Sequence, residues 1–318
     1  MSAPVISVVV PVYNEEKNIP ELFKRIVKAL SDFGRSFEII FVNDGSVDST
    51  EEILTHIYDQ NHHVAVVNLF RKSGKAIALE RGFELVRGQY IVIIDADLQH
   101  DPEDIPRLIV KLEEGFDVVS GKRMNRNDAP GKVLTSRLFN IFMRMLTGLQ
   151  IDDYFSGLKV FRFSVIRFLS LYGDLYRFAS VFAFKKGCKV AEIPCAHHAR
   201  AHGNSSYNSI GRVKLAFKDL MTVMFSVTLS RGRVYVLGIF GLLCLSAALT
   251  CITIAVYRYG CELFLFHKFY GFLSLCFFFL GGQALILKTV ADNFFKKHYD
   301  EFCHRQQNVQ SVLSVKVE

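Results

Sequence analysis

Short apolar runs alternate with segments of helical periodicity in the N-terminal third of the chain, and this alternation limits the fold more than any other feature. Four runs rich in β-branched residues predict buried strands: Val5 to Val12, Phe37 to Val42, Val64 to Leu69 and Ile91 to Ile94. Apolar residues at helical spacing predict a helix from Ile19 to Leu30, and Ser49 or Thr50 begins another. This order is typical of an α/β domain with a Rossmann-like, mostly parallel sheet and flanking helices.

Each predicted strand ends in a polar cluster, and the fourth cluster contains Asp95 and Asp97. Ligands of open α/β sheets bind beyond the carboxyl ends of the strands, so we expect the clusters to surround one crevice. Carboxylates, together with substrate phosphates, are the ligands that Mg²⁺ and Mn²⁺ prefer. Taken alone, the pair is interpreted equally well as an acidic turn that caps the next helix.

Two long stretches without charge, Val234 to Tyr257 and Phe269 to Leu287, lie in the C-terminal third. A helix of about 20 apolar residues crosses the hydrocarbon core of a bilayer. The stretches therefore predict transmembrane helices at about 234–257 and 265–287, the second lengthened by Leu263 to Phe266. The short turn from Arg258 to Glu262 makes them a hairpin. A hairpin buried in a protein core is the alternative, and the length and uniform apolarity of both stretches disfavour it.

Positive charges flank the predicted hairpin on both sides: Arg231, Arg233, Lys288, Lys296 and Lys297. The positive-inside rule places both flanks in the cytoplasm and makes the chain an integral protein of the inner or plasma membrane. Met1 to Tyr13 reads as a strand without a basic region, which predicts no cleavable signal sequence. Seven cysteines without metal-site spacing indicate a reducing compartment.

These features predict four segments. Residues 1–208 form a cytoplasmic catalytic domain, 209–232 a juxtamembrane amphipathic helix, 233–290 the transmembrane hairpin and 291–318 a cytoplasmic tail. In the second segment, apolar residues fall on one helical stripe beside cations, which suits a membrane surface. An ordinary helix packed on the catalytic domain explains that stripe equally well.

A cluster of cations precedes the hairpin in the sequence, with Asp128 as the one carboxylate among them: Lys122, Arg123, Arg126, Lys132, Arg137 and Arg144. Such a cluster can bind and orient a phosphate; a solvated basic face is the alternative. The net charge of +7 is also compatible with nucleic-acid binding as an alternative function. We predict no nucleic-acid partner, because the cations cluster next to the membrane segments and at the phosphate site.

Several motifs, in this order, resemble those of glycosyltransferase family 2: Pro11-Val-Tyr-Asn-Glu15, Asn43-Asp-Gly-Ser46, Asp95-Ala-Asp-Leu-Gln99, Gly121-Lys-Arg123, Arg137, Asp153-Tyr-Phe-Ser-Gly157 and Arg200-Ala-His-Gly203 to Tyr207. The resemblance covers roughly residues 4 to 230. It is greatest to the polyprenyl-phosphate branch, which includes dolichol-phosphate mannosyltransferases and bactoprenol glucosyltransferases. It implies the GT-A fold and a hexosyltransferase with a nucleotide sugar donor and a polyprenyl phosphate acceptor, such as undecaprenyl phosphate.

The resemblance also implies a set of site residues. Those of the donor site are Pro11, Tyr13, Glu15, Asp44, Lys75 and Asp95, with Lys75 near the pyrophosphate; a surface lysine that opens a helix explains Lys75 equally well. Asp95, Asp97 and Gln99 would hold Mg²⁺ or Mn²⁺. Arg123 and Arg137 would bind the acceptor phosphate, and Asp153 would position sugar hydroxyls rather than act as a base. Three residues would close a loop over the donor: Arg200, His202 and Ser206.

The implied reaction inverts the anomeric carbon, because the acceptor phosphate oxygen is already anionic and attacks from the opposite face. UDP-glucose is the expected donor, by likeness to bactoprenol glucosyltransferases, and GDP-mannose is the second. A processive polysaccharide synthase is disfavoured by two spans and the lack of tryptophan, and a non-catalytic scaffold by the intact acidic pair. His197, His198 and His202 lack a companion ligand for zinc. Members of the family often form homo-oligomers.

Overall fold

The computed structural model describes residues 3–124, 140–141, 143–167, 173–198, 231–259, 264–305 and 309–313. The chain divides into two units. The first contains residues 1–220 and 304–318, and the second contains residues 221–303. The second unit is therefore inserted between two parts of the first.

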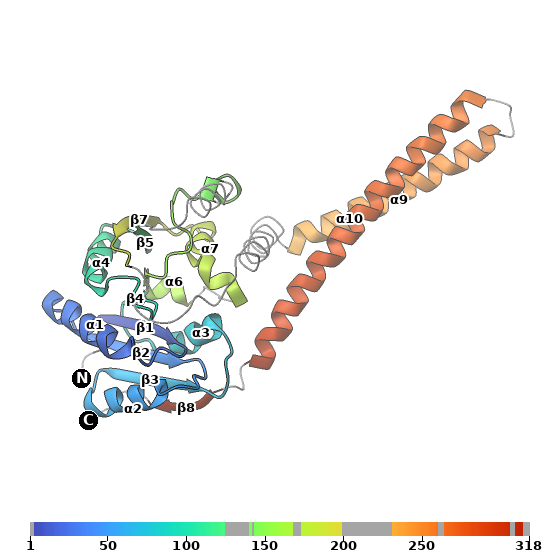
Figure 1. The fold of residues 1–318 in the computed structure, drawn as a ribbon. Helices are drawn as coiled ribbons and strands as arrows, with labels where there is room; N and C mark the ends of the chain where they lie inside the picture. The colour runs from blue at the N-terminus through green and yellow to red at the C-terminus, as the bar shows by residue number, and fades with distance from the viewer. Residues whose placement is uncertain are drawn as a thin grey trace. The chain divides into compact units, whose positions relative to one another are not determined.

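A mixed sheet of eight strands, counted over the described residues, forms the centre of the first unit (Figure 1). The four predicted strands are present as β1 (Ile6–Val12), β2 (Phe37–Asn43), β3 (Val64–Leu69) and β4 (Tyr90–Ile93). The others are β5 (Val118–Arg123), β6 (Lys159–Arg162), β7 (Val190–Cys195) and β8 (Val309–Leu313). Their order is β7-β5-β6-β4-β1-β2-β3-β8. Strands β1 to β4 pair in parallel, as do β5 and β7, whereas β6 and β8 run antiparallel to their neighbours.

Helices cover both faces of this sheet. One face packs against α1 (Ile19–Phe33), α2 (Thr50–Gln60) and α4 (Ile105–Glu113). The other packs against α3 (Lys75–Leu85), α6 (Phe163–Ile166) and α7 (Ala179–Lys185). Successive strand residues alternate between the faces, so Phe41 lies in the first core cluster and Val42 in the second. Two 3-10 helices, η1 (Pro102–Asp104) and η2 (Gly173–Phe178), complete the described elements of this unit.

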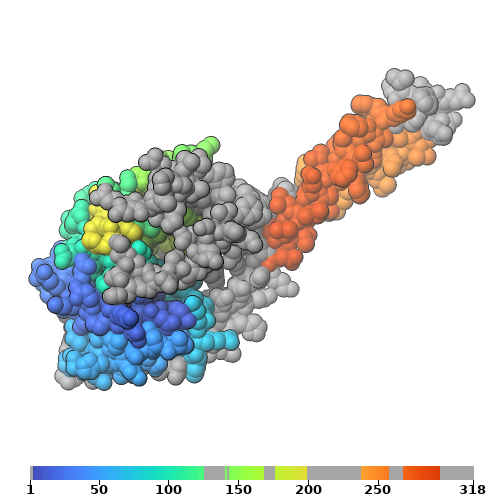
Figure 2. Space-filling view, viewed as in Figure 1, coloured from blue at the N-terminus to red at the C-terminus, as the bar shows by residue number. Residues whose placement is uncertain are grey.

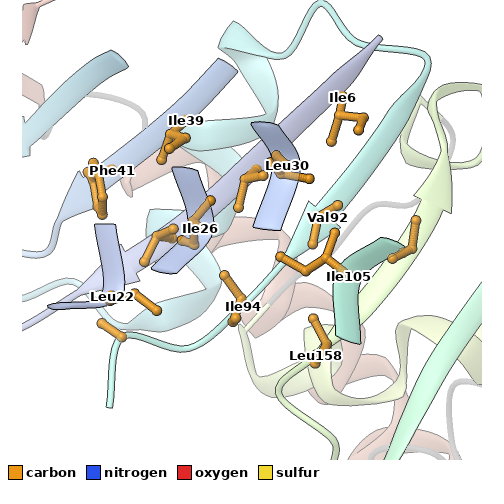
Figure 3. Packing of buried hydrophobic residues seen from close by; sticks show 14 of the residues in the cluster. Ile6, Leu22, Ile26, Leu30, Ile39, Phe41, Val92, Ile94, Ile105 and Leu158 are labelled. Carbon is orange, nitrogen blue, oxygen red and sulfur yellow. The ribbon is translucent and has the colours of Figure 1, made fainter. Parts of the chain in front are cut away.

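The amphipathic pattern of α1 determines how this helix packs. Leu22, Ile26 and Leu30 recur at helical spacing and are fully buried. Figure 3 shows these side chains against residues of the strands, including Ile39 and Phe41. The helix ends at Gly34, whose φ of 73° suits glycine and whose N–H donates to the Leu30 carbonyl.

A buried carboxylate joins the N-terminal ends of the central strands. Glu38 in β2 is 2% exposed and accepts a hydrogen bond from Ser7 Oγ of β1 at 2.6 Å. The Arg87 backbone N–H donates to Glu38 at 2.8 Å, and its guanidinium pairs with the same carboxylate at 2.6 Å. The segment leading into β4 is thereby fastened to β1 and β2.

The second unit is a hairpin of α9 (Arg231–Tyr259) and α10 (Phe264–Arg305), so the predicted two-helix hairpin is confirmed. Both helices are long and apolar enough to cross a membrane, over Gly238–Tyr257 and Lys268–Asn293. Only 17% of the most apolar stretch of each span is buried, and large apolar side chains such as Phe240 and Phe272 are exposed. A hairpin enclosed in a protein core does not have such a surface.

Small residues form the contact between these two helices, which lie side by side (Figure 2). A Cβ added at Gly281 would lie 2.8 Å from the Gly241 carbonyl oxygen. Ser274 Oγ donates to the Ala248 carbonyl at 2.8 Å across the interface. Small residues that allow close backbone approach are typical of helix pairs in membranes.

The structure differs from the sequence expectation after the second span. We predicted that the span ends near residue 287 and that a tail follows from 291, but α10 continues to Arg305 and β8 then joins the sheet. Within this predicted tail, residues 309–313 thus form an edge strand of the first unit. The apolar pattern of this strand in the sequence is weak, because an edge strand pairs with only one neighbour, here β3.

Candidate functional site

The turns after β1 and β2 are tied together by hydrogen bonds. The Asn14 N–H donates to Ser46 Oγ at 2.9 Å, and the Val47 N–H donates to Asn14 Oδ1 at 2.9 Å. The Glu15 N–H donates to Thr50 Oγ1 at 3.1 Å. Asn14 has a φ of 54°, a left-handed conformation that asparagine tolerates better than most residues. These bonds bring the first two motifs into one place.

Three further donor-site candidates lie around these turns. Pro11 is half-buried in β1, paired in register with Val42 of β2. The half-buried Tyr13 ring lies under the Lys72 ammonium, whose nitrogen is 3.7 Å from the ring centroid. The Glu15 carboxylate accepts a hydrogen bond from Asn18 Nδ2 at 2.5 Å. An aromatic face and a carboxylate therefore flank the end of β1.

Asp44 holds the turn after β3 in place. Its carboxylate accepts hydrogen bonds from the N–H groups of Ser73 at 2.6 Å and Gly74 at 2.9 Å. Burial raises the pKa of Asp44, and these two hydrogen bonds oppose the rise. Gly45 allows the close approach: at its φ of 65°, an added Cβ would lie 2.4 Å from the Arg71 carbonyl carbon. Asp44 thus orders the loop that leads to α3.

Lys75, the first residue of α3, forms an ion pair with Asp95 Oδ1. Its ammonium also lies 5.0 Å from the centroid of the Tyr176 ring. Burial alone lowers the pKa of Lys75, but the charge and hydrogen bond of Asp95, together with Tyr176 and Asp97, outweigh burial and leave this pKa raised. Likewise, burial raises the pKa of Asp95, but Lys75, together with His100 and Lys159, outweighs burial and leaves that pKa lowered. Both groups are therefore charged at neutral pH.

Asp97 lies in a tight turn after β4. The Gln99 N–H donates to Asp97 Oδ1 at 3.2 Å, and only 8% of Asp97 is exposed. Between them, Leu98 has a φ of 58°. A leucine with left-handed backbone is energetically costly, and such residues gather where the surrounding structure imposes a geometry for function.

Gly157 packs against both Asp95 and His100. An added Cβ at this position would lie 2.4 Å from Asp95 Oδ2 and 3.2 Å from His100 Cδ2. The Gly157 N–H donates to His100 Nε2 at 3.1 Å, so the neutral ring carries its proton on Nδ1. Burial lowers the pKa of His100 to about 4, and the ring is neutral at physiological pH.

A pocket of about 180 Å³ lies beside Asp95, with Lys75, Phe155, Tyr176 and Lys159 among its lining residues. Lys159 begins β6 and is 3% exposed. Its ammonium donates to the carbonyls of Tyr154 and Arg177, at 3.1 Å each. Burial lowers the pKa of Lys159 to about 8, against the attraction of Asp153. Lys159 therefore fastens two walls of the pocket to each other.

Arg123, a predicted acceptor residue, pairs with Asp153. The two bonds are Nε to Oδ2 at 2.6 Å and Nη2 to Oδ1 at 2.8 Å, and Asp153 is 5% exposed. Glu192 of β7 accepts the Asp153 N–H at 2.7 Å. Both carboxylate oxygens of Asp153 are therefore engaged in orienting the guanidinium of Arg123.

Carboxylates from outside the stretch Lys122 to Arg144 pair with several cations of the cluster. Lys122 and Arg144 both form ion pairs with Asp152. Three of the six cations therefore meet the adjacent pair Asp152 and Asp153, which the fold brings in from the next segment. Within its own stretch of sequence the cluster has the single carboxylate Asp128, and the fold adds Asp152 and Asp153 from outside that stretch.

The segment after β7 is tied to the turn that carries the acidic pair. The His198 N–H donates to the Gln99 carbonyl at 2.9 Å, and the His197 ring contacts His100 edge-on at 5.6 Å. The remaining predicted residues lie outside the described residues: Arg137, Arg200, His202, Ser206 and nearly all of the juxtamembrane helix 209–232.

The chemistry of these residues fits a divalent cation that substrate helps to bind. No group of three His, Cys, Asp or Glu side chains suited to a metal occurs within the ranges that the structure describes. The chain instead offers Asp95 and Asp97, and Mg²⁺ is commonly held by one or two carboxylates plus substrate phosphates. The ammonium of Lys75 already places a positive charge at Asp95.

Sequence reasoning missed Lys159, Tyr176 and Glu192 as parts of this site. A charged residue at the start of the otherwise apolar Lys159-Val-Phe run, just after Ser156 and Gly157, is the signal that marks Lys159. Tyr176 and Glu192 have no such signal, because their segments are brought to the site only by the tertiary fold.

Comparison with known families gives one clear match. A family profile described as Glycosyl transferase family 2 matches residues 7–170. An undecaprenyl-phosphate 4-deoxy-4-formamido-L-arabinose transferase of Pseudomonas aeruginosa (strain LESB58) is 38% identical over 226 residues, which cover 71% of this chain and 66% of that protein. The protein of that name from Salmonella newport (strain SL254) is 34% identical over 248 residues, or 76% of each chain. The match thus spans just under two thirds of the Pseudomonas relative.

Solved structures of glucosyl-3-phosphoglycerate synthase from Mycobacterium tuberculosis share the fold. The complex with uridine diphosphate is 22% identical, with a TM-score of 0.54 over 70% of this chain and 79% of that one. The complex with Mn²⁺ and UDP-glucose is 21% identical, with a TM-score of 0.53 over 70% and 78%. The predicted GT-A arrangement of the first unit is confirmed.

Proposed function

The chain belongs to glycosyl transferase family 2, and on this premise we propose that it transfers a sugar from a nucleotide diphosphate sugar to a polyprenyl phosphate, with inversion of the anomeric carbon. One observation carries the proposal. The fold joins the segments that follow β1, β2, β3 and β4 at one edge of the sheet, and these segments carry Tyr13, Asp44, Lys75 and Asp95. The names of the 34–38% identical relatives support the acceptor.

The donor end of the site follows from these contacts. Tyr13 offers an aromatic face for a nucleobase, and the backbone of the turn after β3, ordered by Asp44, lies next to Lys75. Asp95 and Asp97, with Gln99, would hold Mg²⁺ or Mn²⁺, which supplies neutralisation of charge on the departing diphosphate. The Mn²⁺ in complexes of the structural neighbours supports this choice of cofactor. The left-handed backbone of Leu98 and the close packing of Gly157 against Asp95 shape the acidic turn at that position.

The acceptor end rests on Arg123, which Asp153 orients through two hydrogen bonds. A guanidinium held in this way binds a phosphate group in a defined direction. The acceptor oxygen is anionic at neutral pH and needs no general base. We therefore assign Asp153 to positioning Arg123, in place of the sugar hydroxyls named from sequence. That Arg137 binds the acceptor phosphate together with Arg123 stays a prediction.

The membrane hairpin supports a lipid acceptor, because a polyprenyl phosphate keeps its phosphate at the membrane surface. We place the protein in the inner or plasma membrane with its catalytic unit in the cytoplasm. Closure of Arg200, His202 and Ser206 over the donor, and a homo-oligomeric state, also stay predictions.

The donor sugar has three candidates, two from the sequence and one from the names of the relatives. UDP-glucose is the donor that the sequence predicts, ahead of GDP-mannose. The nucleotide-linked 4-deoxy-4-formamido-L-arabinose is the third candidate, because the relatives are named for that sugar.

The experiment incubates the purified protein with undecaprenyl phosphate and each of these donors, with and without EDTA, and detects the glycolipid by mass spectrometry. One donor should give a singly glycosylated lipid phosphate, and EDTA should abolish it. Absence of product with every donor would contradict the proposal.

The same assay tests Asp97. Asp97→Asn should lower turnover by at least about 100-fold, the scale of losing one strong electrostatic contact to developing charge. Circular dichroism should be unchanged, because the amide keeps an oxygen for the Gln99 N–H. Asp59→Asn, at an exposed position of α2, is the control and should retain full turnover.

A further inference from the structure

Asp95 is a candidate ligand of the metal and also pairs with Lys75, so two cations have the same carboxylate as their partner. A carboxylate in a partly buried site needs a positive partner. In the structure that partner is the ammonium of Lys75, and the two side chains are 27% and 31% exposed. A lysine ammonium is a compact charge on a flexible stem, so it can leave one partner for another.

The two oxygens of Asp95 are not equivalent. Oδ2 faces Gly157 so closely that a Cβ there would lie 2.4 Å away. Oδ1 bears the ammonium of Lys75. A cation that binds Asp95 through Oδ1 therefore meets the oxygen that Lys75 already holds.

Lys75 lines a pocket into which its side chain can move. The pocket of about 180 Å³ that it lines together with Asp95 is also lined by Tyr176, whose ring centroid is 5.0 Å from the ammonium. The residue before Lys75 is Gly74, with a φ of 98°, and its N–H is bound to Asp44. The backbone at the start of α3 is thus held while the side chain can change partner.

We propose that Lys75 is an internal counter-ion that competes with the divalent cation for Asp95 and transfers to the donor diphosphate when the donor binds. The proposal rests on the proposed function for the identity of the donor. Two cations at one carboxylate oxygen repel each other, so the metal and Lys75 exclude each other there. Donor phosphates accept the displaced ammonium, which couples donor binding to metal binding in both directions.

The test measures Mn²⁺ binding to the purified full chain by electron paramagnetic resonance of free Mn²⁺, with and without UDP. Without nucleotide, Lys75→Gln should bind Mn²⁺ about tenfold more tightly than the wild type, since a charge-assisted contact no longer competes. Lys75→Arg keeps a cation at Asp95 with more donors and should bind Mn²⁺ no more tightly than the wild type. The gain in Mn²⁺ affinity caused by UDP should be smaller in Lys75→Gln than in the wild type.

Lys72→Gln is the matched control, because it removes one positive charge from the same loop but its ammonium lies over Tyr13. Its Mn²⁺ affinity without nucleotide should stay within about twofold of the wild type. Equal or weaker Mn²⁺ binding by Lys75→Gln would overturn the proposal, and so would equal tightening by Lys72→Gln.

The outcome is separable from that of the glycolipid assay. Glycolipid formation together with unchanged Mn²⁺ binding by Lys75→Gln would reject the counter-ion role alone. Tighter Mn²⁺ binding by Lys75→Gln without glycolipid from any donor would support the exchange at Asp95 and reject the proposed reaction.

Discussion

At the scale of single residues, the site is built from charges that the fold pairs before any substrate arrives. Lys75 meets Asp95, and Arg123 meets Asp153. Lys159 differs, because its buried ammonium donates to two backbone carbonyls. Within the part of the chain that the structure describes, no carboxylate forms an ion pair with it. A buried charge of this kind is costly, so it makes stability depend on pH.

Lys159 should make the protein more stable as pH rises from about 8 toward 10.5. Its pKa is lowered from 10.5 to about 8 by burial. In that window the unfolded chain binds more protons than the folded one, so the free energy of unfolding rises with pH. The gain saturates at about 3 kcal/mol, at about 1.4 kcal/mol per pKa unit.

Thermal unfolding of the wild type and Lys159→Met, followed by circular dichroism at pH 7.5 and 10, measures this effect. The stability of the wild type relative to the variant should increase at the higher pH. Lys28→Met, at an exposed position of α1, controls for the loss of one lysine. A pH-independent difference for Lys159→Met would contradict the assignment.

At the scale of elements, close approaches and buried ties determine which strands and helices meet. The sheet order follows from these contacts, and so does the hairpin. Strands β1 to β4 and the helix α1 were predicted closely from sequence, since their apolar patterns are strong. Strands β5 to β8 were not predicted, because the first three include polar residues of the site and β8 is a short edge strand.

Gly281 should be essential to the hairpin and Gly282 should not. A Cβ at Gly281 would lie 2.8 Å from the Gly241 carbonyl oxygen and 2.9 Å from Leu245, whereas a Cβ at Gly282 would meet nothing within 4 Å. Gly281→Leu should therefore separate α9 from α10, and Gly282→Leu should not. Disulfide cross-linking between cysteines placed at the interface measures the separation. Equal cross-linking in both variants would show that the glycine contact is dispensable.

Glu38 should matter far more to stability than Glu84, although each pairs with an arginine. The side chain of Glu38 is 3% exposed and that of Glu84 is 54% exposed. Glu38→Ala leaves Ser7 and Arg87 without their shared partner and should cost about 3 kcal/mol. Glu84→Ala should cost less than about 1 kcal/mol. Thermal unfolding in detergent compares the two, and similar losses would mean that the tie between β1 and β2 is unimportant.

At the scale of the whole molecule, the chain leaves the first unit for the hairpin and then returns to the same sheet. Because β8 pairs with β3, both ends of the hairpin must lie on one side of a membrane that it crosses. Sequence reasoning reached this topology from the short turn between the two spans, and it assigned the side from the flanking charges. The strand pairing adds an independent constraint, since one sheet cannot lie on both sides of a bilayer.

Single-cysteine variants test this topology. A membrane-impermeant maleimide added to intact cells should label Cys261, in the predicted turn, and should leave Cys188 and Cys303 unlabelled until the cells are opened. Labelling of Cys303 but not Cys188 from outside would break the shared-side requirement, and with it the pairing of β8 with β3.

The sequence by itself determined the parts of this protein that depend on local pattern. Apolar periodicity marked the four parallel strands and the hairpin, and the motifs identified the family and pointed to Asp95, Asp97 and Asp153. Only the tertiary structure decided the long-range contacts. The ion pairs are Lys75 with Asp95 and Arg123 with Asp153. Lys159 donates to the carbonyls of Tyr154 and Arg177, and β8 pairs with β3. The physical reason is range. Secondary structure follows from neighbours a few residues apart, whereas these contacts join segments distant in sequence, and their energies exist only once the chain has closed around them.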